Sequence, residues 1–286
     1  MTKSATSKSA INPVGITPLS HGTPKILMCP PDYFALEYAI NPWMENTAPL
    51  DRDLARRQWD TLYQAISQEA GVLVIEPVEG LPDLVFTANA AFIYGQEAII
   101  AHYKHPERRG EEPHCAQWFK ASGFNVTLPP NDIFFEGAGD ALIWQDRIFA
   151  GYKTRTDIRS HTLLSEVTGL PVLSLELINP NFYHIDVCLC PLEDGHFIYS
   201  PEAFNEYGNL VIEANVPERK RIAVSPEEAA QFACNAINIG RRVIFNQGSN
   251  RLSEALFERG FNVTQIDLSE FLKSGGSAKC LSLRVA

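Results

Sequence analysis

The sequence predicts an α/β fold in which five similar ββαβ-like units form a ring, a five-bladed α/β propeller with pseudo-fivefold symmetry. First, one pattern recurs: a phenylalanine, a few small or polar residues, an apolar run, a turn and a second apolar run. The leading phenylalanines, spaced by 48, 48 and 50 residues, are Phe86, Phe134, Phe182 and Phe232. Second, the pentapeptide GFNVT occurs at residues 123–127 and again at 260–264. Third, one apolar strand near each end of the chain has no partner within its own unit.

The N-terminal part of the chain precedes the repeats. Residues 1–24 are polar and rich in Ser, Thr and Lys, so we expect a flexible tail followed by a single domain over residues 25–286. Residues 26–29 form a short apolar run before two prolines, which predicts a strand. Apolar residues at helical spacing predict a helix over residues 51–69, and residues 71–75 (GVLVI) are typical of a buried strand.

A helix and a strand are expected between successive hairpins of the repeat. The periodicity predicts helices over residues 111–122, 157–168, 226–235 and 249–260. The fifth unit begins near Ser269 and has its first strand at residues 280–285, where the sequence ends. Its missing partner is the strand at residues 26–29, so that strands from both termini close the ring. An open α/β sheet that only looks periodic is the alternative.

Composition and charge argue against several classes of protein. The chain has 286 residues, of which 45% are hydrophobic and 20% charged, a globular balance. A formal net charge of −10 argues against nucleic acid as a partner. The chain has six cysteines, no signal-peptide pattern and no apolar run as long as a membrane span. We therefore expect a cytoplasmic protein with free thiols and no membrane contact.

Equivalent positions of the repeat bring chemistry-bearing side chains together. In a ring of like units, the position two residues after the leading phenylalanine faces the central axis. The residues at this position are Ala88, Glu136, His184 and Cys234. Asn89 is one residue further along, and Cys280 follows two glycines in the fifth unit. We expect Glu136 and His184 to meet these two residues in one pocket, where carboxylate, imidazole, amide and thiol suit nucleophilic catalysis at a cationic carbon.

Each of these residues also has a structural interpretation. A glutamate in a Gly-rich segment is usually a solvated loop residue, and a histidine on a strand is usually a hydrogen-bonded structural group. A cysteine is most often a small buried hydrophobe. The shared position in the repeat favours the functional interpretation for the set as a whole.

Residues 184–190 (HIDVCLC) allow a second interpretation. On a strand, alternation would place His184, Asp186, Cys188 and Cys190 on one face, which suggests a metal site. Four ligands in a row along one strand span too far to meet one tetrahedral ion, and no second ligand cluster occurs. We therefore expect no metal, with His184 active in the chemistry, Asp186 binding substrate or orienting a neighbour, and the two cysteines in the core.

Two arginines complete the expected pocket. Arg108 and Arg155 each follow the second strand of a hairpin, which places them at the rim of a unit. A rim arginine is usually solvated, but two at one pocket mouth could hold a carboxylate bidentately. A ligand with a cationic end deep in the pocket and a carboxylate at the mouth describes arginine or a relative.

Four motifs carry a resemblance to a known family. They are residues 86–89 (FTAN), 136–140 (EGAGD), 184–186 (HID) and 275–280 (GGSAKC). On these motifs, residues 26–285 resemble the guanidino-group-modifying superfamily, which includes arginine deiminases, dimethylarginine dimethylaminohydrolases and amidinotransferases. The resemblance implies a five-bladed α/β propeller, the pentein fold, forming a single catalytic domain without a cofactor.

Within the superfamily the sequence is most similar to arginine dihydrolases, through residues 41–43 (NPW) and Asn89, where deiminases carry an aspartate. This resemblance implies hydrolysis of L-arginine to L-ornithine, ammonia and carbon dioxide. Cys280 would form a covalent thiouronium intermediate, and His184 would act as acid and base. Glu136, with Asn89 and Asn41, would hold the guanidinium.

The remaining roles follow from the same resemblance. Asp186 would contact substrate nitrogens, Arg108 and Arg155 would bind the α-carboxylate, and Asp140 would support the Glu136 loop beside the substrate. The segment 32–50 is a candidate lid, and a homo-oligomer is an open alternative to a monomer. The rival functions are a deiminase or dimethylarginine dimethylaminohydrolase giving citrulline, and a non-catalytic arginine-binding protein.

Overall fold

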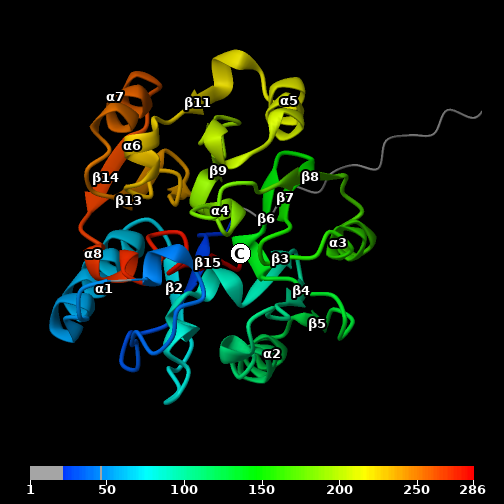
Figure 1. Cartoon of the computed structure of the whole chain (residues 1–286), viewed down its shortest axis with the longest axis vertical. Helices are drawn as coiled ribbons and strands as arrows, with labels where there is room; N and C mark the ends of the chain where they lie inside the picture. The colour runs from blue at the N-terminus through cyan, green and yellow to red at the C-terminus, as the bar shows by residue number, and fades with distance from the viewer. Residues whose placement is uncertain (1–21, 46) are drawn as a thin grey trace, which may run out of the picture.

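The computed structural model describes residues 22–45 and 47–286 and shows five small sheets around a central axis (Figure 1). Most of the expected tail, residues 1–21, lies outside the described residues. Each sheet has three strands: an antiparallel pair and a third strand parallel to the middle strand of the sheet. This arrangement confirms the predicted five-unit α/β propeller and excludes the single open sheet.

Four sheets follow one another along the chain. Their strands are β3 (Ala91–Tyr94), β4 (Glu97–Ile100) and β5 (Asn125–Thr127); β6 (Ala141–Trp144), β7 (Arg147–Tyr152) and β8 (Val172–Glu176); β9 (Leu189–Pro191), β10 (Phe197–Tyr199) and β11 (Arg221–Ala223); and β12 (Ile237–Ile239), β13 (Arg242–Asn246) and β14 (Asn262–Ile266). The two GFNVT copies supply β5 and β14, the outer strands of their sheets.

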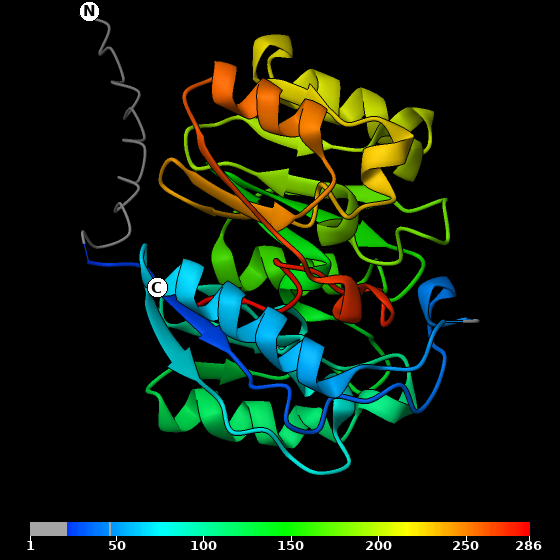
Figure 2. The same cartoon turned by 90° about the vertical axis from the view of Figure 1, so that its left-hand side faces the viewer.

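The fifth sheet joins the two ends of the described chain. The strand β1 (Lys25–Met28) pairs antiparallel with β15 (Leu283–Arg284) and parallel with β2 (Gly71–Val74). The C-terminus therefore lies beside the first strand (Figure 2). This pairing confirms the closure predicted from the two unpartnered apolar strands.

Helices lie on the outside of the ring (Figure 1). The longer ones are α1 (Arg52–Ser67), α2 (Glu111–Ala121), α3 (Ser160–Thr168), α5 (Glu206–Asn215) and α7 (Asn250–Glu258). The first begins at Asp51, whose Oδ1 accepts from the Leu54 amide at 2.9 Å, a typical N-cap. Its inner face buries Trp59 and Ile66. None of the helices within residues 22–45 and 47–286 is long and apolar enough to cross a membrane.

The helix predictions were correct for four ranges and wrong for one. The predicted helix over residues 226–235 is only the short α6 (Pro226–Ala229). The chain then turns at Phe232, which has a φ of 60°, a left-handed value that cannot continue a right-handed helix. The sequence analysis also missed α5, which Asn205 caps through its side chain.

Short helical turns complete the fold. They are η1 (Pro42–Met44), η2 (Pro82–Val85), η3 (Thr87–Asn89), η4 (Pro106–Arg108), η5 (Gly137–Gly139), η6 (Pro201–Ala203), η7 (Glu218–Lys220), α4 (Ile185–Cys188) and α8 (Ser269–Leu272). Three of these, η3, η5 and α4, occupy the same place in successive blades, between the leading phenylalanine and the hairpin. The polar residues of the repeat therefore lie in tight turns near the axis rather than on strands.

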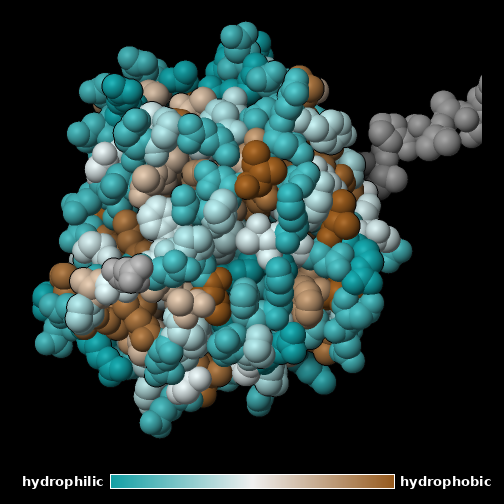
Figure 3. All heavy atoms as spheres, in the orientation of Figure 1, coloured by the Kyte–Doolittle hydropathy of each residue, from teal (hydrophilic) through white to brown (hydrophobic). Residues whose placement is uncertain are grey.

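Apolar side chains pack between the blades and beneath the helices. For example, Phe149 and Phe197, from neighbouring blades, are buried with their ring centroids 4.8 Å apart. Polar side chains cover most of the face shown in Figure 3, with apolar side chains in scattered places. Side chains fill the spaces between the blades and leave a pocket near the axis for the polar site.

Candidate active site

Glu136 and His184 meet at the axis of the ring. Both side chains are fully buried, and His184 Nε2 lies 2.7 Å from Glu136 Oε2. Each stands immediately before the helical turn of its blade, η5 and α4 respectively. Gly137 follows with a φ of 62°, and a Cβ there would lie 2.7 Å from the Asn89 carbonyl oxygen. Glycine at this position therefore allows the blade carrying Asn89 to approach.

Asn89 adjoins this pair. Its Nδ2 lies 3.4 Å from the Glu136 carbonyl oxygen and 3.5 Å from His184 Nδ1. Its Oδ1 accepts a hydrogen bond from Arg108 Nη1 at 2.9 Å. The structure thus brings together Asn89, Glu136 and His184, three residues of equivalent turns in three blades.

Cys280 belongs to the turn that precedes β15 and is buried. Its thiol lies 3.5 Å from Asp186 Oδ2, and Asn235 Nδ2 donates to its Sγ at 3.1 Å. Gly276, four residues earlier, approaches Phe86 so closely that a Cβ would lie 2.1 Å from the ring. Each of these contacts crosses from one blade to another.

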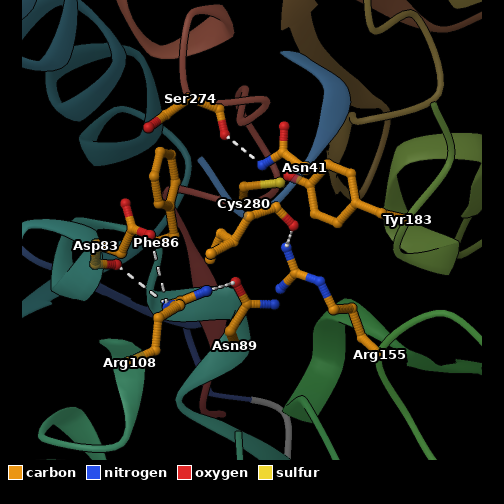
Figure 4. Close-up of a pocket in the computed structure, with 10 residues that line it drawn as sticks. Asn41, Asp83, Phe86, Asn89, Arg108, Arg155, Tyr183, Ser274 and Cys280 are labelled. Carbon is orange, nitrogen blue, oxygen red and sulfur yellow. Dashed lines mark hydrogen bonds and ion pairs between the residues drawn. The ribbon is translucent and has the colours of Figure 1, made fainter. Parts of the chain in front are cut away.

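Cys280, Asn89 and Phe86 line a small pocket (Figure 4). Glu136, His184, Asp186 and Asn235 do not line it. Its walls are formed by Ile40, Asn41, Asp83, Phe86, Asn89, Arg108, Arg155, Tyr183, Ser274 and Cys280. In Figure 4 the thiol lies at the centre of this group, with the two arginine side chains reaching toward it from the opposite side. The pocket therefore combines a thiol, two cations and the Asp83 carboxylate.

The sequence analysis placed the two arginines at the rim of the pocket, but the structure buries both. Arg108 and Arg155 are each only 3% exposed. Arg108 is held by Glu111, which accepts from its Nε and Nη2 at 2.8 Å each. Arg155 donates to Glu136 Oε2 and to the Ile40 carbonyl, both at 2.9 Å. Both arginines are therefore buried with carboxylate partners in the pocket wall rather than solvated at a rim.

Glu136, which the sequence analysis expects to grip a guanidinium, is bonded to groups of the protein itself. Its Oε2 is shared by His184 and Arg155, its Oε1 accepts from the Lys104 amide at 3.3 Å, and it does not line the pocket. The carboxylate that contacts the Cys280 thiol is that of Asp186.

The strand predicted over residues 184–190 is also wrong. His184 has extended backbone, residues Ile185–Cys188 form the helical turn α4, and β9 starts only at Leu189. The four side chains therefore do not share a strand face. Within residues 22–45 and 47–286, no group of three or more His, Cys, Asp or Glu side chains is placed to hold a metal ion.

Asp140 supports α4 rather than lining the pocket, contrary to its predicted place beside the substrate. Its Oδ1 accepts from the Ile185 amide at 3.0 Å, the first amide of the turn that carries Asp186. Asn41 does line the pocket, and both ends of its amide are occupied. Its Nδ2 donates to the Ser274 carbonyl at 3.0 Å, and its Oδ1 accepts from the Trp43 amide at 3.0 Å. Asn41 thus ties the segment 32–50 to the turn before Cys280.

The ionisable groups fall into two electrostatic classes. Burial alone would raise the pKa of Glu136, but the charge of Arg155 and the hydrogen bond from His184 bring that pKa below its usual value. Burial raises the pKa of Asp186 to about 7, against the opposing effects of Lys279, Cys280 and Asn235. Burial, followed by the Asp186 carboxylate, raises the pKa of the Cys280 thiol. A cation bound beside Asp186 and Cys280 would favour the ionised forms of both.

The sequence analysis missed three residues of the site. Asn235 stands three residues after Phe232, as Asn89 stands three after Phe86, so the repeat contained a signal for it. Asp83 lines the pocket and accepts from the Tyr38 hydroxyl at 3.0 Å, and Tyr183 donates to the Gly275 carbonyl at 2.6 Å. Neither of these two lies at a repeated position, so only the folded chain reveals them.

Comparison with known proteins decides the family. Residues 31–285 match the family described as N,N dimethylarginine dimethylhydrolase, eukaryotic. The chain belongs to this dimethylarginine dimethylaminohydrolase family. A member from Mycobacterium tuberculosis, named N(G),N(G)-dimethylarginine dimethylaminohydrolase, is 40% identical over 264 residues, covering 92% of this chain and 86% of the relative.

Bifunctional relatives share this family's domain. The bifunctional arginine dihydrolase/ornithine cyclodeaminase AgrE from Nostoc sp. is 46% identical over 264 residues, which are 91% of this chain but 38% of AgrE. The chain thus spans less than two-fifths of that relative. The crystal structure of the N-terminal domain of ArgZ, covalently bound to a reaction intermediate, superposes with a TM-score of 0.91 at 45% identity. The match covers 92% of this chain and 98% of that domain, in agreement with the pentein fold.

Proposed function

We propose that the chain is an arginine dihydrolase, which converts L-arginine and two molecules of water to L-ornithine, two molecules of ammonia and carbon dioxide. The observation that carries the proposal is Asn89, a neutral amide at the wall of a pocket that also holds a thiol. The likeness to ArgZ, which is described as an arginine dihydrolase, supports it.

The charges of the pocket suit both ends of arginine. Asp186 and Cys280 lie together and both become more acidic beside a cation, which fits the guanidinium group. Arg108 and Arg155 supply buried guanidinium groups that can bind the α-carboxylate. The Asp83 carboxylate, which lines the same pocket, suits the α-ammonium group. L-Arginine is therefore the small-molecule partner that we propose.

The first half of the reaction removes one ammonia. Binding of the guanidinium favours the Cys280 thiolate, which attacks the central carbon and forms a C–S bond. His184 gives a proton to the departing nitrogen as the C–N bond breaks, and a thiouronium intermediate remains. Glu136 holds His184 in place through the 2.7 Å contact between its Oε2 and His184 Nε2.

The second half repeats this chemistry. His184 takes a proton from water as the water attacks the thiouronium carbon, and release of the thiolate leaves a ureido group, the citrulline stage. The thiolate then attacks the ureido carbon, a second ammonia leaves, and water hydrolyses the thiocarbamate. The carbamate formed in this way splits into carbon dioxide and ornithine.

Asn89 distinguishes this sequence of steps from one that stops at citrulline. A ureido group presents an oxygen, which needs a hydrogen-bond donor, where the guanidinium presented an N–H. A carboxylate has no proton to offer and would repel the ureido oxygen, whereas an amide can present either its NH₂ or its oxygen. Asn89 therefore retains citrulline in the pocket for the second half.

Product analysis tests the proposal. The chain is incubated separately with arginine, citrulline and asymmetric dimethylarginine, and ornithine, citrulline, ammonia and dimethylamine are quantified. We expect two ammonia per ornithine from arginine and direct consumption of citrulline. One ammonia per citrulline with no ornithine would show a deiminase, and heat of arginine binding without ammonia would show a non-catalytic binding protein.

The second candidate is a dimethylarginine dimethylaminohydrolase. The family match and the 40% identical mycobacterial relative favour it. Its signature in the same assay is dimethylamine and citrulline from dimethylarginine, with little turnover of arginine. A cytoplasmic location and a homo-oligomer remain predictions beside this proposal; the six free thiols are consistent with the former.

A further inference from the structure

One fully buried side chain outside the expected site contacts the nucleophile directly. Asn235 Nδ2 donates to Cys280 Sγ at 3.1 Å and to the Asp186 carbonyl at 3.0 Å. Its Oδ1 accepts from the amides of Lys279 at 3.0 Å and Cys280 at 3.2 Å. One amide group therefore makes four hydrogen bonds, which satisfy both N–H donors and both lone pairs.

These bonds hold three separate segments together. Asn235 lies just before β12, Asp186 lies in α4, and Lys279 and Cys280 lie in the turn before β15. The left-handed backbone of Phe232, at a φ of 60°, turns the chain out of α6 and toward the axis. The amide thus fixes the backbone on which the thiol stands and also contacts its sulfur.

We propose that Asn235 is a further catalytic residue, which orients Cys280 and donates a hydrogen bond that stabilises its thiolate. The proposal rests on Cys280 acting as the nucleophile of the proposed reaction. A hydrogen bond to the charged form of an acid favours that form, and its effect is greatest where water is excluded. Cys280 is 2% exposed, so few other donors can reach its sulfur.

The other charged groups around the thiol leave this task to Asn235. Asp186, at 3.5 Å, opposes a second negative charge. Lys279 is adjacent in sequence, but its Nζ donates to the Ser282 carbonyl at 3.3 Å. The Tyr183 hydroxyl donates to the Gly275 carbonyl. Across the pocket Arg108, Arg155 and Asp83 bond to one another or to other protein groups. Asn235 is thus the side chain that donates to the sulfur, beside the backbone amide of Ser277, which also favours the thiolate.

Asn235→Asp separates orientation from donation. The substitution keeps an oxygen to accept from the two backbone amides but removes the N–H that faces sulfur. The measurement is the rate of Cys280 alkylation by iodoacetamide at about pH 8 without substrate, after subtraction of the Cys280→Ala rate. Because the pKa of the thiol is raised, only a small fraction is thiolate at this pH, and we expect the rate to fall about tenfold or more. With arginine we expect kcat to fall at least tenfold and KM to change less than threefold.

A matched control is Asn246→Asp. Asn246 is buried at the end of β13 of the same blade, and its side chain bonds to the carbonyls of Gln231 and Gln247 and to the Leu268 amide. Asn246 is also buried and fully hydrogen-bonded but does not contact Cys280, so the alkylation rate of Cys280 in this variant should match wild type. An unchanged alkylation rate in folded Asn235→Asp would overturn the proposal.

A measurement on the wild-type chain keeps the test valid if the variant does not fold. In a ¹⁵N-Asn-labelled sample, the side-chain NH₂ signals of Asn235 should shift as the Cys280 thiol ionises, and Cys280→Ala should abolish this shift. Signals that stay fixed through the ionisation would contradict the proposal. Neither the alkylation nor the NMR titration uses arginine. The role of Asn235 can therefore be tested even if the chain does not turn over arginine.

Discussion

Glu136 and Asp186 are equally buried carboxylates of one site, but their surroundings differ. Glu136 accepts from Arg155 and His184, both through Oε2, and its pKa is lowered. Within the described residues, Asp186 Oδ2 accepts from the Cys280 thiol, and burial raises the pKa of Asp186 to about 7. The charge of Glu136 is thus balanced by Arg155, whereas Asp186 has no ion pair within the described residues.

This difference separates a prebuilt part of the site from a part that a ligand completes. The buried Glu136–Arg155 ion pair can hold both of its charges without a ligand because each group has a partner within the protein. Asp186 and Cys280 carry their full charge only when a cation lies beside them. A guanidinium substrate would supply this cation, so binding and activation of the nucleophile become one event.

The largest effect is expected at the nucleophile. Cys280→Ala should lower kcat for arginine by about 10⁴-fold or more, because no other group can form the covalent intermediate. The matched control is Cys234→Ala. Cys234 is a fully buried thiol at the repeat position equivalent to Glu136 and His184, and it belongs to the hydrophobic core. The control should keep activity within a few-fold of wild type, and circular dichroism should show that both variants are folded. An active Cys280→Ala enzyme would exclude the covalent mechanism.

The second prediction compares the two carboxylates directly. Glu136→Gln leaves Arg155 buried without a full counter-charge, so we expect a loss of about 3 kcal/mol in unfolding free energy and about 10² to 10³-fold in kcat. Asp186→Asn removes a charge that the empty protein holds poorly. We expect it to cost little stability at pH 7 and to raise the KM for arginine. Urea unfolding and steady-state kinetics measure both effects, and equal stability losses in the two variants would refute the distinction.

The third prediction concerns the products. Asn89→Asp should shift them from ornithine toward citrulline by about tenfold or more, because the added carboxylate repels the ureido oxygen. Chromatography of the products from arginine gives the ratio. Asn41→Asp is a suitable control, since Asn41 lines the same pocket but bonds to the backbone of Ser274 and Trp43. An unchanged ratio in Asn89→Asp would show that Asn89 does not retain citrulline.

The sequence predicted the ring and its closure well because both depend on patterns that recur. The spacing of Phe86, Phe134, Phe182 and Phe232 revealed four blades, and residues 26–29 and 280–285 revealed the fifth. Local pattern was less reliable. Residues 184–190 alternate like a strand, yet α4 forms because the buried Asp140 carboxylate accepts from its first amide. This tertiary hydrogen bond has no signature within the segment itself.

The sequence predicted which residues of the site lie close together, but it did not predict which of them form hydrogen bonds or ion pairs with one another. The repeat indicated that Glu136 and His184 converge. It gave no sign that Arg155 reaches the same carboxylate from the following turn, or that Glu111 holds Arg108. Side-chain direction at a turn depends on neighbouring blades, and a repeat position specifies only the backbone. Asn235, by contrast, was predictable from the repeat. It lies three residues after Phe232, as Asn89 lies three after Phe86, but the sequence analysis compared only the position two residues after each phenylalanine.

The last effect expected is a difference in how stability depends on pH. The pKa of Asp186 is about 7 in the folded protein, compared with an ordinary value of 3.8. The folded state therefore holds this proton more tightly than the unfolded chain. Its contribution to stability is complete below about pH 4 and is lost as the pH rises through 7. At 1.36 kcal/mol per pKa unit, the loss is at most roughly 4 kcal/mol.

The contribution of Glu136 to stability depends on pH in the opposite direction. Its folded pKa lies below the ordinary 4.5, so its contribution is present above that pH and is lost only as the pH falls through the folded value. Between pH 5 and 8, Asp186→Asn should therefore become steadily more stable relative to wild type, whereas the deficit of Glu136→Gln should stay nearly constant. Urea unfolding at four pH values gives both differences. If Asp186→Asn and wild type ran parallel over this range, Asp186 would already be ionised in the empty pocket and would not await a cation.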